Sequence, residues 1–280
     1  GMQLRHPLTV RVYDGVEQDD LLYLIMELVD GQELGHLLKQ QPALPLGMNL
    51  AIILQVLNAL ACAHQQGVIH RDIKPANIMI RQDYTIALTD FGIAHLSGSE
   101  LTQAGELLGS PLYMAPEQLR GEPVDLRTDL FSTGVLLYFL LTHRKPFMAD
   151  SLATLMQKIL HEEPLPPSLI QRTVPMVFDA VLQRALAKDP AQRFASAAEF
   201  ADTLRQARTE ALNATVIAPS PRSRRLIAPL REMGSDQPMM IGLTVETWIE
   251  PMTALVQECL AERATGGRLD RLAASLAAAL

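Results

Sequence analysis

The chain has 280 residues, of which 48% are hydrophobic and 20% are charged. This apolar content is ample for a packed core and excludes global disorder, while the formal net charge of -7 argues against a nucleic-acid partner. The two cysteines, Cys62 and Cys259, are too few and too distant for a disulfide framework. We therefore expect a cytoplasmic protein with no membrane span in this chain, although a longer parent protein could carry a membrane anchor.

Strand and helix signals alternate over the first ninety residues or so. Residues 8–14 and 21–28 are apolar and β-prone, and the polar stretch between them predicts a β-hairpin. Residues 33–39 predict a short helix, and residues 46–66 have the length and apolar content of a buried helix with Gly67 as its C-cap. Short strand-like pieces follow at residues 68–69, 78–80 and 86–88.

The rest of the chain is predicted to be mainly helical. Residues 130–141 are apolar nearly all round, which is typical of a core helix, and residues 196–199 form a capping box that opens a helix to about residue 208. Further helices are expected at residues 151–160 and 175–188. Residues 212–240 contain four prolines, which is typical of a linker, and helical stretches follow it.

Four polar side chains near the middle of the sequence have the chemistry that phosphoryl transfer needs. Asp72 and Asn77 lie on one loop between two short strands, where a carboxylate can orient a hydroxyl and an amide oxygen can face a divalent ion. Asp90 closes the next strand, where a carboxylate can hold Mg²⁺ against phosphate oxygens. Lys74 follows Asp72 by two residues and can reach the transferred phosphate as a mobile charge.

Three short motifs carry a family resemblance. Residues 70–77 read HRDIKPAN, residues 90–92 read DFG and residues 115–117 read APE, and these signatures of protein kinases occur in the right order. Two further matching segments lie at residues 129–134 and 188–194. The stretch from Leu4 to about Leu204 therefore resembles the bacterial eukaryotic-like serine/threonine protein kinases.

This resemblance implies an α+β, protein-kinase-like fold with a mainly helical large lobe and only a remnant of the small β lobe. Residues 1–31 would be that remnant together with the hinge, and residues 32–208 would be the large lobe. Residues 209–240 would be a linker, and residues 241–280 a helical segment of unknown role.

The resemblance also implies roles for the phosphoryl-transfer residues. Asp72 would act as the catalytic base or, more cautiously, orient the substrate hydroxyl, and Asn77 and Asp90 would be the Mg²⁺ ligands. Lys74 marks the serine/threonine branch and, with Asp90, belongs to the ATP-binding set. The expected cofactors are ATP and Mg²⁺, and the expected partners are protein substrates that carry serine or threonine.

The hinge of the kinase fold would lie at residues 27–29. Met26 would limit the back of the adenine pocket, backbone groups of Glu27 and Val29 would bind the adenine edge, and Met79 would pack beneath it. Taken alone, Met26 and Met79 would each be read as core residues, and it is their register with the catalytic loop that favours the nucleotide role.

Other matched positions would have structural or regulatory roles. Glu117 and Arg193 resemble the buried ion pair of the large lobe, and Asp129 resembles the helix-start aspartate that holds the backbone of the catalytic loop. Arg71 would receive a phosphate carried by the segment between Asp90 and Glu117, with Thr102 as the best candidate for that phosphorylation.

Thr215 has two possible interpretations on the sequence alone. Thr215 could be a docking point for a phosphothreonine-reading partner, and the plainer interpretation is an ordinary linker threonine. The histidines show no metal-ligand spacing, so surface or capping roles are expected for them. These histidines are His64, His95, His143 and His161.

The sequence departs from the family pattern at its start. No Gly-x-Gly-x-x-Gly precedes the hinge and no lysine precedes Lys39, whereas a kinase needs a glycine-rich loop and a strand lysine over the phosphates. One hypothesis is that the chain is an incomplete copy of an active kinase. The alternative is a catalytically dead kinase-like binding or scaffold module. Under either hypothesis we expect negligible phosphorylation by the chain as given.

Overall fold

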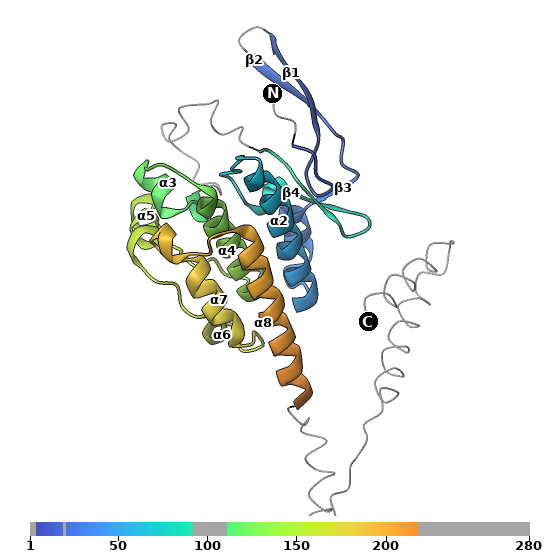
Figure 1. Ribbon diagram of the computed structural model, residues 1–280. Helices are drawn as coiled ribbons and strands as arrows, with labels where there is room; N and C mark the ends of the chain where they lie inside the picture. The colour runs from blue at the N-terminus through green and yellow to red at the C-terminus, as the bar shows by residue number, and fades with distance from the viewer. Residues whose placement is uncertain (1–3, 19–20, 92–110, 218–280) are drawn as a thin grey trace, which may run out of the picture. The chain divides into compact units, whose positions relative to one another are not determined.

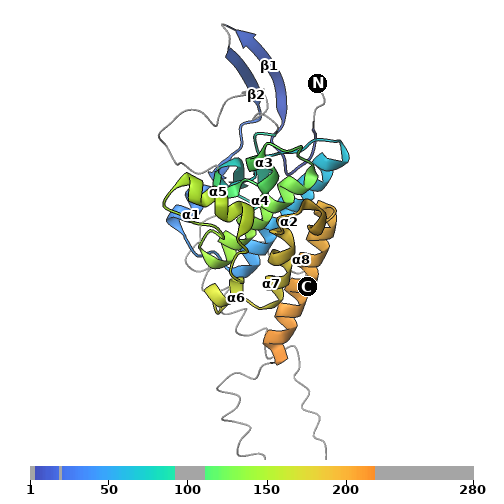
Figure 2. The ribbon, with the colours of Figure 1, turned by 90° about the vertical axis from the view of Figure 1, so that its left-hand side faces the viewer.

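A β-hairpin begins the part of the chain that the computed structural model describes, which comprises residues 4–18, 21–91 and 111–217. β1 (Val12–Gln18) pairs antiparallel with β2 (Leu21–Met26), so the predicted hairpin is confirmed. The predicted bounds of its first strand are wrong, because β1 continues through polar residues that were expected in the turn. Every residue of β1 is exposed, so polar side chains are tolerated there. The hairpin stands apart from the helices in Figures 1 and 2.

A second, antiparallel sheet contains β3 (Gly31–Glu33), β4 (Ile78–Arg81) and β5 (Ile86–Leu88), in that order. Along β4, Ile78 and Ile80 are buried while the alternate residues are partly exposed on the other face. The strand predicted at residues 68–69 is wrong. Val68 N–H instead donates to the carbonyl oxygen of Ala63 at 3.0 Å, in the turn that follows a helix.

Four helices that pack against one another form the body of the described residues (Figure 1). They are α2 (Leu46–Gln65), α4 (Leu126–Thr142), α7 (Val177–Ala185) and α8 (Ala197–Ile217). α2 packs against α4 and α8, and α7 contacts both α4 and α8. The other helices of the described residues are α1 (Leu34–Gln40), α3 (Pro116–Arg120), α5 (Leu152–His161) and α6 (Pro167–Ile170), with 3-10 turns at Pro75–Asn77, Pro111–Tyr113 and Pro190–Gln192. The described residues therefore have the mainly helical α+β arrangement that was predicted.

By length and composition, α2 could cross a membrane, and it is the single helix of the described residues that passes this test. Half of the apolar window that passes is buried inside the protein, and Ile53, Val56 and Leu57 have no exposed surface. Because α2 packs against two other helices, these contacts are those of a core helix. The helix is followed by Gly67, whose φ of 72° is a left-handed conformation that glycine adopts without strain.

Gly134 lies where α4 packs against α7. A Cβ atom at this position would lie 2.9 Å from the Cβ of Ala185, so Gly134→Ala should lower the free energy of unfolding by about 1–3 kcal/mol through overpacking. Alanine's helix propensity, better than that of glycine by about 1 kcal/mol, would offset part of this loss. Gly47→Ala in α2 is the matched control, because no atom lies within 4 Å of its Cβ position. Urea unfolding that gave equal stabilities for the two variants would contradict the packing argument.

α8 is longer than predicted. It continues to Ile217, so the predicted helix end near residue 208 is wrong, and residues 209–217 are helical rather than linker. Buried residues recur at helical spacing across residue 208, with Leu204, Ala207 and Ala211 all buried. Thr215 therefore lies in a helix. The rest of the predicted linker and the C-terminal segment, at residues 218–280, lie outside the described residues.

Candidate active site

Asp129, in the first turn of α4, holds the backbone of the loop that carries the predicted catalytic residues. Its Oδ2 accepts a hydrogen bond from His70 N at 2.9 Å and its Oδ1 accepts one from Arg71 N at 2.7 Å. Arg71 has a φ of 71°, a conformation that costs a non-glycine residue about 1–3 kcal/mol. The two hydrogen bonds therefore fix this loop in a strained shape on the end of a buried helix.

His64 also contacts Asp129, and its predicted surface or capping role is wrong. His64 Nε2 lies 2.7 Å from Asp129 Oδ2, and the two side chains are 6% and 0% exposed. The histidine comes from α2 and the aspartate from α4, so this contact joins the two core helices beneath the loop. It could not be found from ligand spacing, because the partners are far apart in the sequence.

The carboxylate of Asp72 contacts two of the other predicted site residues, Lys74 and Asn77. Lys74 Nζ is 2.7 Å from Asp72 Oδ2, and the Asn77 amide nitrogen donates to Asp72 O at 2.8 Å and to Asp72 Oδ2 at 2.9 Å. Asp72 and Lys74 remain partly exposed, whereas Asn77 is buried. The loop therefore presents one carboxylate and one cation to solvent, and the carboxylate is oriented by the buried amide of Asn77.

His70 is a site residue to which the sequence analysis assigned no role beyond its motif. Its Nε2 donates to Thr89 O at 2.7 Å, and its Nδ1 accepts from Asp72 N at 3.3 Å. Burial lowers the pKa of His70, although the charges of Asp129 and Asp72 oppose that shift. A neutral imidazole has one donor and one acceptor nitrogen, which matches these two bonds. His70 thus connects the Asp72 loop to the strand end before Asp90.

Asn77 and Asp90 come from adjoining stretches of backbone. Thr89 N donates to Asn77 O at 3.0 Å, and Asp90 is the next residue, with a left-handed φ of 61°. Because Asn77 Nδ2 is directed to Asp72, its Oδ1 is the side-chain atom left to face a cation. An amide oxygen and a carboxylate suit Mg²⁺, which completes its shell with phosphate oxygens and water. Within the described residues, no cluster of three His, Cys, Asp or Glu side chains could hold a metal by itself.

The predicted nucleotide-binding residues lie around the chain segment that links the two sheets. Met26 ends β2 and is 39% exposed, while Leu28 beside it is 97% exposed. Met79 pairs with Glu33 of β3 and lies on the partly exposed face of β4. Met26 and Met79 are therefore not buried core residues, and their contact with adenine, like that of Glu27 and Val29, stays a prediction.

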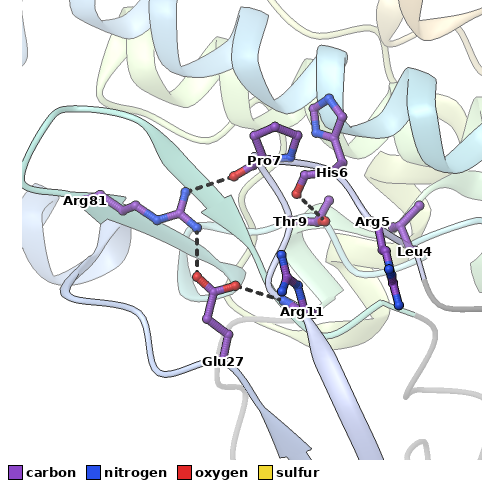
Figure 3. A pocket seen from close by; sticks show the side chains of 8 residues that line it. All are labelled: Leu4, Arg5, His6, Pro7, Thr9, Arg11, Glu27 and Arg81. Atoms are coloured by element: carbon purple, nitrogen blue, oxygen red, sulfur yellow. Dashed lines mark hydrogen bonds and ion pairs between the residues drawn. The ribbon is translucent and has the colours of Figure 1, made fainter.

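Arg81 contacts both Glu27, in the predicted hinge, and the backbone of Pro7, as Figure 3 shows. Its guanidinium donates to Pro7 O at 3.1 Å and to Ile86 O at 2.8 Å, and it lies 3.5 Å from Glu27 Oε1. The second carboxylate oxygen of Glu27 accepts from Arg11 N at 3.3 Å. A pocket of about 440 Å³ lies here, and its lining includes Glu27 and Arg81 but neither Asp72 nor Asp90. Its lining is therefore separate from the predicted phosphoryl-transfer residues.

Glu117 and Arg193 form an ion pair in the core of the helical body. Arg193 Nη1 and Nη2 donate to the two carboxylate oxygens of Glu117 at 2.7 and 2.8 Å, and both side chains are almost fully buried. Thr128 Oγ1 also donates to Glu117 Oε1 at 2.7 Å. Burial by itself would raise the pKa of Glu117, but the hydrogen bonds and positive charge of Arg193 lower it below its ordinary value. The carboxylate is therefore ionised and fully paired.

The predicted regulatory contact joins Arg71 to a phosphate on Thr102, and of these two residues the structure describes Arg71. Thr102 lies outside the described residues. The backbone of Arg71 is bound on both sides, since Asp129 accepts from its N–H and Gln118 Nε2 donates to its carbonyl oxygen at 2.9 Å. The segment that begins with α3 and the catalytic loop are therefore in direct contact, and reception of a phosphate by Arg71 stays a prediction.

The chain is similar in sequence to known protein kinases. The protein kinase domain family matches residues 2–205. The chain is 38% identical over 198 residues to a probable serine/threonine-protein kinase of Clostridium perfringens, covering 70% of this chain and 29% of that protein. It is 39% identical over 235 residues to the serine/threonine-protein kinase PknB of Mycolicibacterium smegmatis, covering 81% and 38%. For PknB of Mycobacterium tuberculosis the identity is 40% over 210 residues, covering 72% and 34%.

The chain spans about a third of the length of these relatives. The predicted resemblance to bacterial serine/threonine kinases and the predicted kinase-like fold are confirmed. Matching residues cover more than half of the chain, and they contain the loop held by Asp129, the Asp72 carboxylate and the Glu117–Arg193 pair. The chain therefore belongs to the protein kinase family.

Proposed function

We propose that this chain carries the phosphoryl-transfer residues of an ATP- and Mg²⁺-dependent serine/threonine protein kinase. The observation that supports this most directly is the arrangement of Asp72, Lys74 and Asn77, with Lys74 Nζ and Asn77 Nδ2 at 2.7 and 2.9 Å from one oxygen of Asp72. A binding module would not need a partly exposed carboxylate that is oriented by a cation and a buried amide.

In this proposal, Asp72 accepts a hydrogen bond from the serine or threonine hydroxyl of a protein substrate and orients its oxygen toward the γ-phosphorus of ATP. The new oxygen–phosphorus bond forms as the bond to the β-phosphate oxygen breaks, ADP leaves, and the hydroxyl proton passes to Asp72 and then to solvent. Lys74 would release Asp72 in part and cover the charge that develops on the transferred phosphoryl group.

Asn77 Oδ1 and the Asp90 carboxylate would hold Mg²⁺, which neutralises phosphate charge when it is bound. His70, by linking Thr89 O to Asp72 N, keeps these two ligands and the base in one register. The hinge residues Met26, Glu27 and Val29 would border the adenine, with Met79 below it. A cytoplasmic site of action is proposed from the cysteine content and the need for ATP.

The proposal is tested by adding the glycine-rich loop and the strand lysine, which this sequence does not contain. The small lobe of one of the bacterial relatives, fused before Leu4, would supply a glycine-rich loop and a strand lysine. We expect the fusion to transfer ³²P from γ-labelled ATP to serine and threonine peptides, at a rate approaching the about 1–100 per second of protein kinases. Transfer should need Mg²⁺ and should not extend to a tyrosine peptide.

Two controls make this result specific. The small lobe alone and the chain alone should each give negligible transfer. A fusion that is folded and binds ATP but phosphorylates no peptide would reject the proposal and favour the alternative, a catalytically dead kinase-like binding or scaffold module. A phosphothreonine-reading partner at Thr215 is a weaker proposal, because that residue lies in α8 and would have to leave the helix to bind in an extended form.

A further inference from the structure

Lys145 lies in the segment between α4 and α5, and its ammonium group is held against aromatic side chains. Lys145 Nζ donates a hydrogen bond to the hydroxyl of Tyr113. It also lies 3.9 Å from the centre of the Tyr113 ring and 3.6 Å from the centre of the Phe139 ring. Such contacts favour the charged form through the electron-rich ring faces. They leave the ammonium with donor capacity that no carboxylate of residues 4–18, 21–91 or 111–217 uses.

Lys145 differs in this respect from Lys188, the other lysine that lies over an aromatic ring. Lys188 Nζ is 4.0 Å from the centre of the Phe147 ring, but it also donates to Ile159 O at 2.8 Å, and Glu163 and Glu162 support its charge. No carboxylate of the described residues lies within ion-pair distance of Lys145. Burial lowers the pKa of Lys145 to about 7, with no opposing charge.

The contacts of Tyr113 connect Lys145 to the helix that also holds the proposed catalytic loop. Ser132 Oγ donates to Tyr113 O at 2.7 Å, and Asp129, one turn earlier on the same face of α4, holds Arg71 of the catalytic loop. One helix face therefore fixes both the Tyr113 backbone and the loop that carries Asp72. The two segments also meet through Gln118, whose side chain donates to Arg71 O. A substrate chain with its hydroxyl at Asp72 would pass near Tyr113.

We propose that Lys145, framed by Tyr113 and Phe139, is a specificity-determining residue that receives an acidic side chain of the protein substrate near the acceptor hydroxyl. This inference rests on the proposed function and names its substrate class. A carboxylate would accept the unused N–H groups of a half-buried ammonium, forming a charge-assisted hydrogen bond. A basic residue at the same substrate position would be repelled, because its charge would face a cation that has no counter-ion among the described residues.

The experiment measures binding, so that it does not depend on phosphate transfer. Fluorescent peptides contain one serine and, at each flanking position in turn, aspartate or the neutral isostere asparagine. We expect the chain to bind the aspartate peptide about ten- to a hundredfold more tightly at one position, the difference typical of a hydrogen bond to a charged group. Lys145→Met, which keeps the length and apolar stem of the side chain, should remove this preference, and Lys145→Arg should keep most of it.

Arg144→Met is the matched control, since Arg144 is the adjacent residue, is exposed and carries the same charge. It should leave the aspartate preference unchanged, and an equal loss in both variants would overturn the proposal in favour of a general electrostatic attraction. A second readout is the ¹³Cε resonance of Lys145, assigned with Lys145→Met. Its titration midpoint should rise when the aspartate peptide is added and should not move with the asparagine peptide.

The remaining outcomes separate this inference from the proposed function. Equal binding of the two peptides with an unchanged Lys145 resonance would reject the specificity role, even if the fused kinase phosphorylated both. Selective binding of acidic peptides without phosphorylation by the fusion would support the role of Lys145 and reject the enzymatic activity. A phosphoserine peptide forms a further arm, and a preference for it over aspartate would identify phosphate rather than carboxylate as the favoured acid.

Discussion

Replacement of Asp72 by asparagine is expected to lower phosphate transfer by the fused kinase by about 10²- to 10⁴-fold, the usual contribution of a positioned acid–base group. The substitution keeps the size of the side chain and an oxygen that can still accept from Asn77. It removes the charge that Lys74 contacts at 2.7 Å, and it turns an amide N–H₂ either to Lys74 or to the substrate hydroxyl. Neither orientation can accept the hydroxyl proton, so kcat should fall while the KM for ATP changes little.

A surface carboxylate provides the control for this change. Asp83 lies in the turn between β4 and β5 and accepts hydrogen bonds from Thr85, so Asp83→Asn removes the same charge away from the loop. It should keep the full rate of transfer. If Asp72→Asn retained that rate as well, or if both variants lost activity together with folded structure in circular dichroism, the assignment of Asp72 would not stand.

Replacement of Arg193 by methionine is expected to lower the free energy of unfolding by about 3–5 kcal/mol, the effect of breaking a buried ion pair. Arg193 makes two hydrogen bonds to Glu117 and further bonds to the carbonyl oxygens of Ala187, Arg127 and Lys188. Its removal leaves a buried carboxylate whose remaining side-chain hydrogen-bond donor, among the described residues, is Thr128. Since whole domains are stable by about 5–15 kcal/mol, the loss should be visible as a large fall in the urea midpoint.

The loss of stability in Arg193→Met should depend on pH in a defined direction. The pKa of Glu117 is lowered in the folded protein from the value of 4.5, so the pair contributes stability above about pH 4.5 that is lost as the pH falls through the folded pKa. In Arg193→Met, the effect of burial, which raises the pKa of Glu117, is no longer opposed by Arg193. The difference in stability between the two proteins should therefore be largest near neutral pH and shrink in acid.

Two further variants show that burial is the cause. Arg205→Met breaks an exposed pair with Asp202, whose side chains are 54% and 69% exposed, and should cost only about 0–1 kcal/mol. Adding Glu117→Gln to Arg193→Met removes the stranded charge and should recover part of the loss. A loss in Arg193→Met no larger than that in Arg205→Met would mean that the Glu117 site admits water and is not the dry pair described above.

The parts of the fold and site that follow from sequence are those encoded by contiguous residues. The core helices α2 and α4 follow from long apolar runs, and the Asp72–Asn77 contact follows from a motif of adjacent residues. One short strand, β3, was missed because it depends on pairing with another strand. β3 has three residues, all exposed, and is a strand because β4 lies beside it. His64 and Lys145 likewise acquire their contacts from distant residues, so no local pattern marks them.

The end of α8 could not be predicted from composition. Residues beyond 208 were read as linker because prolines and serines follow, but the buried positions Ala207 and Ala211 continue the helix face for another turn. Alanine is small and common in both surface and core helices, so its burial depends on how closely the neighbouring helices approach. That distance is a property of the packed structure and is not visible in the composition.

The attachment of the catalytic loop to Asp129 determines when its conformational entropy is lost. The loop is tied to α4 and α3 by side chains of the helical body, so we expect its order to be acquired when that body folds rather than when nucleotide or substrate arrives. Ligand binding then avoids a cost of about 1–2 kcal/mol for each backbone residue that would otherwise have to be ordered. The part of the proposed site that lies on this loop would then be ordered before its ligands bind.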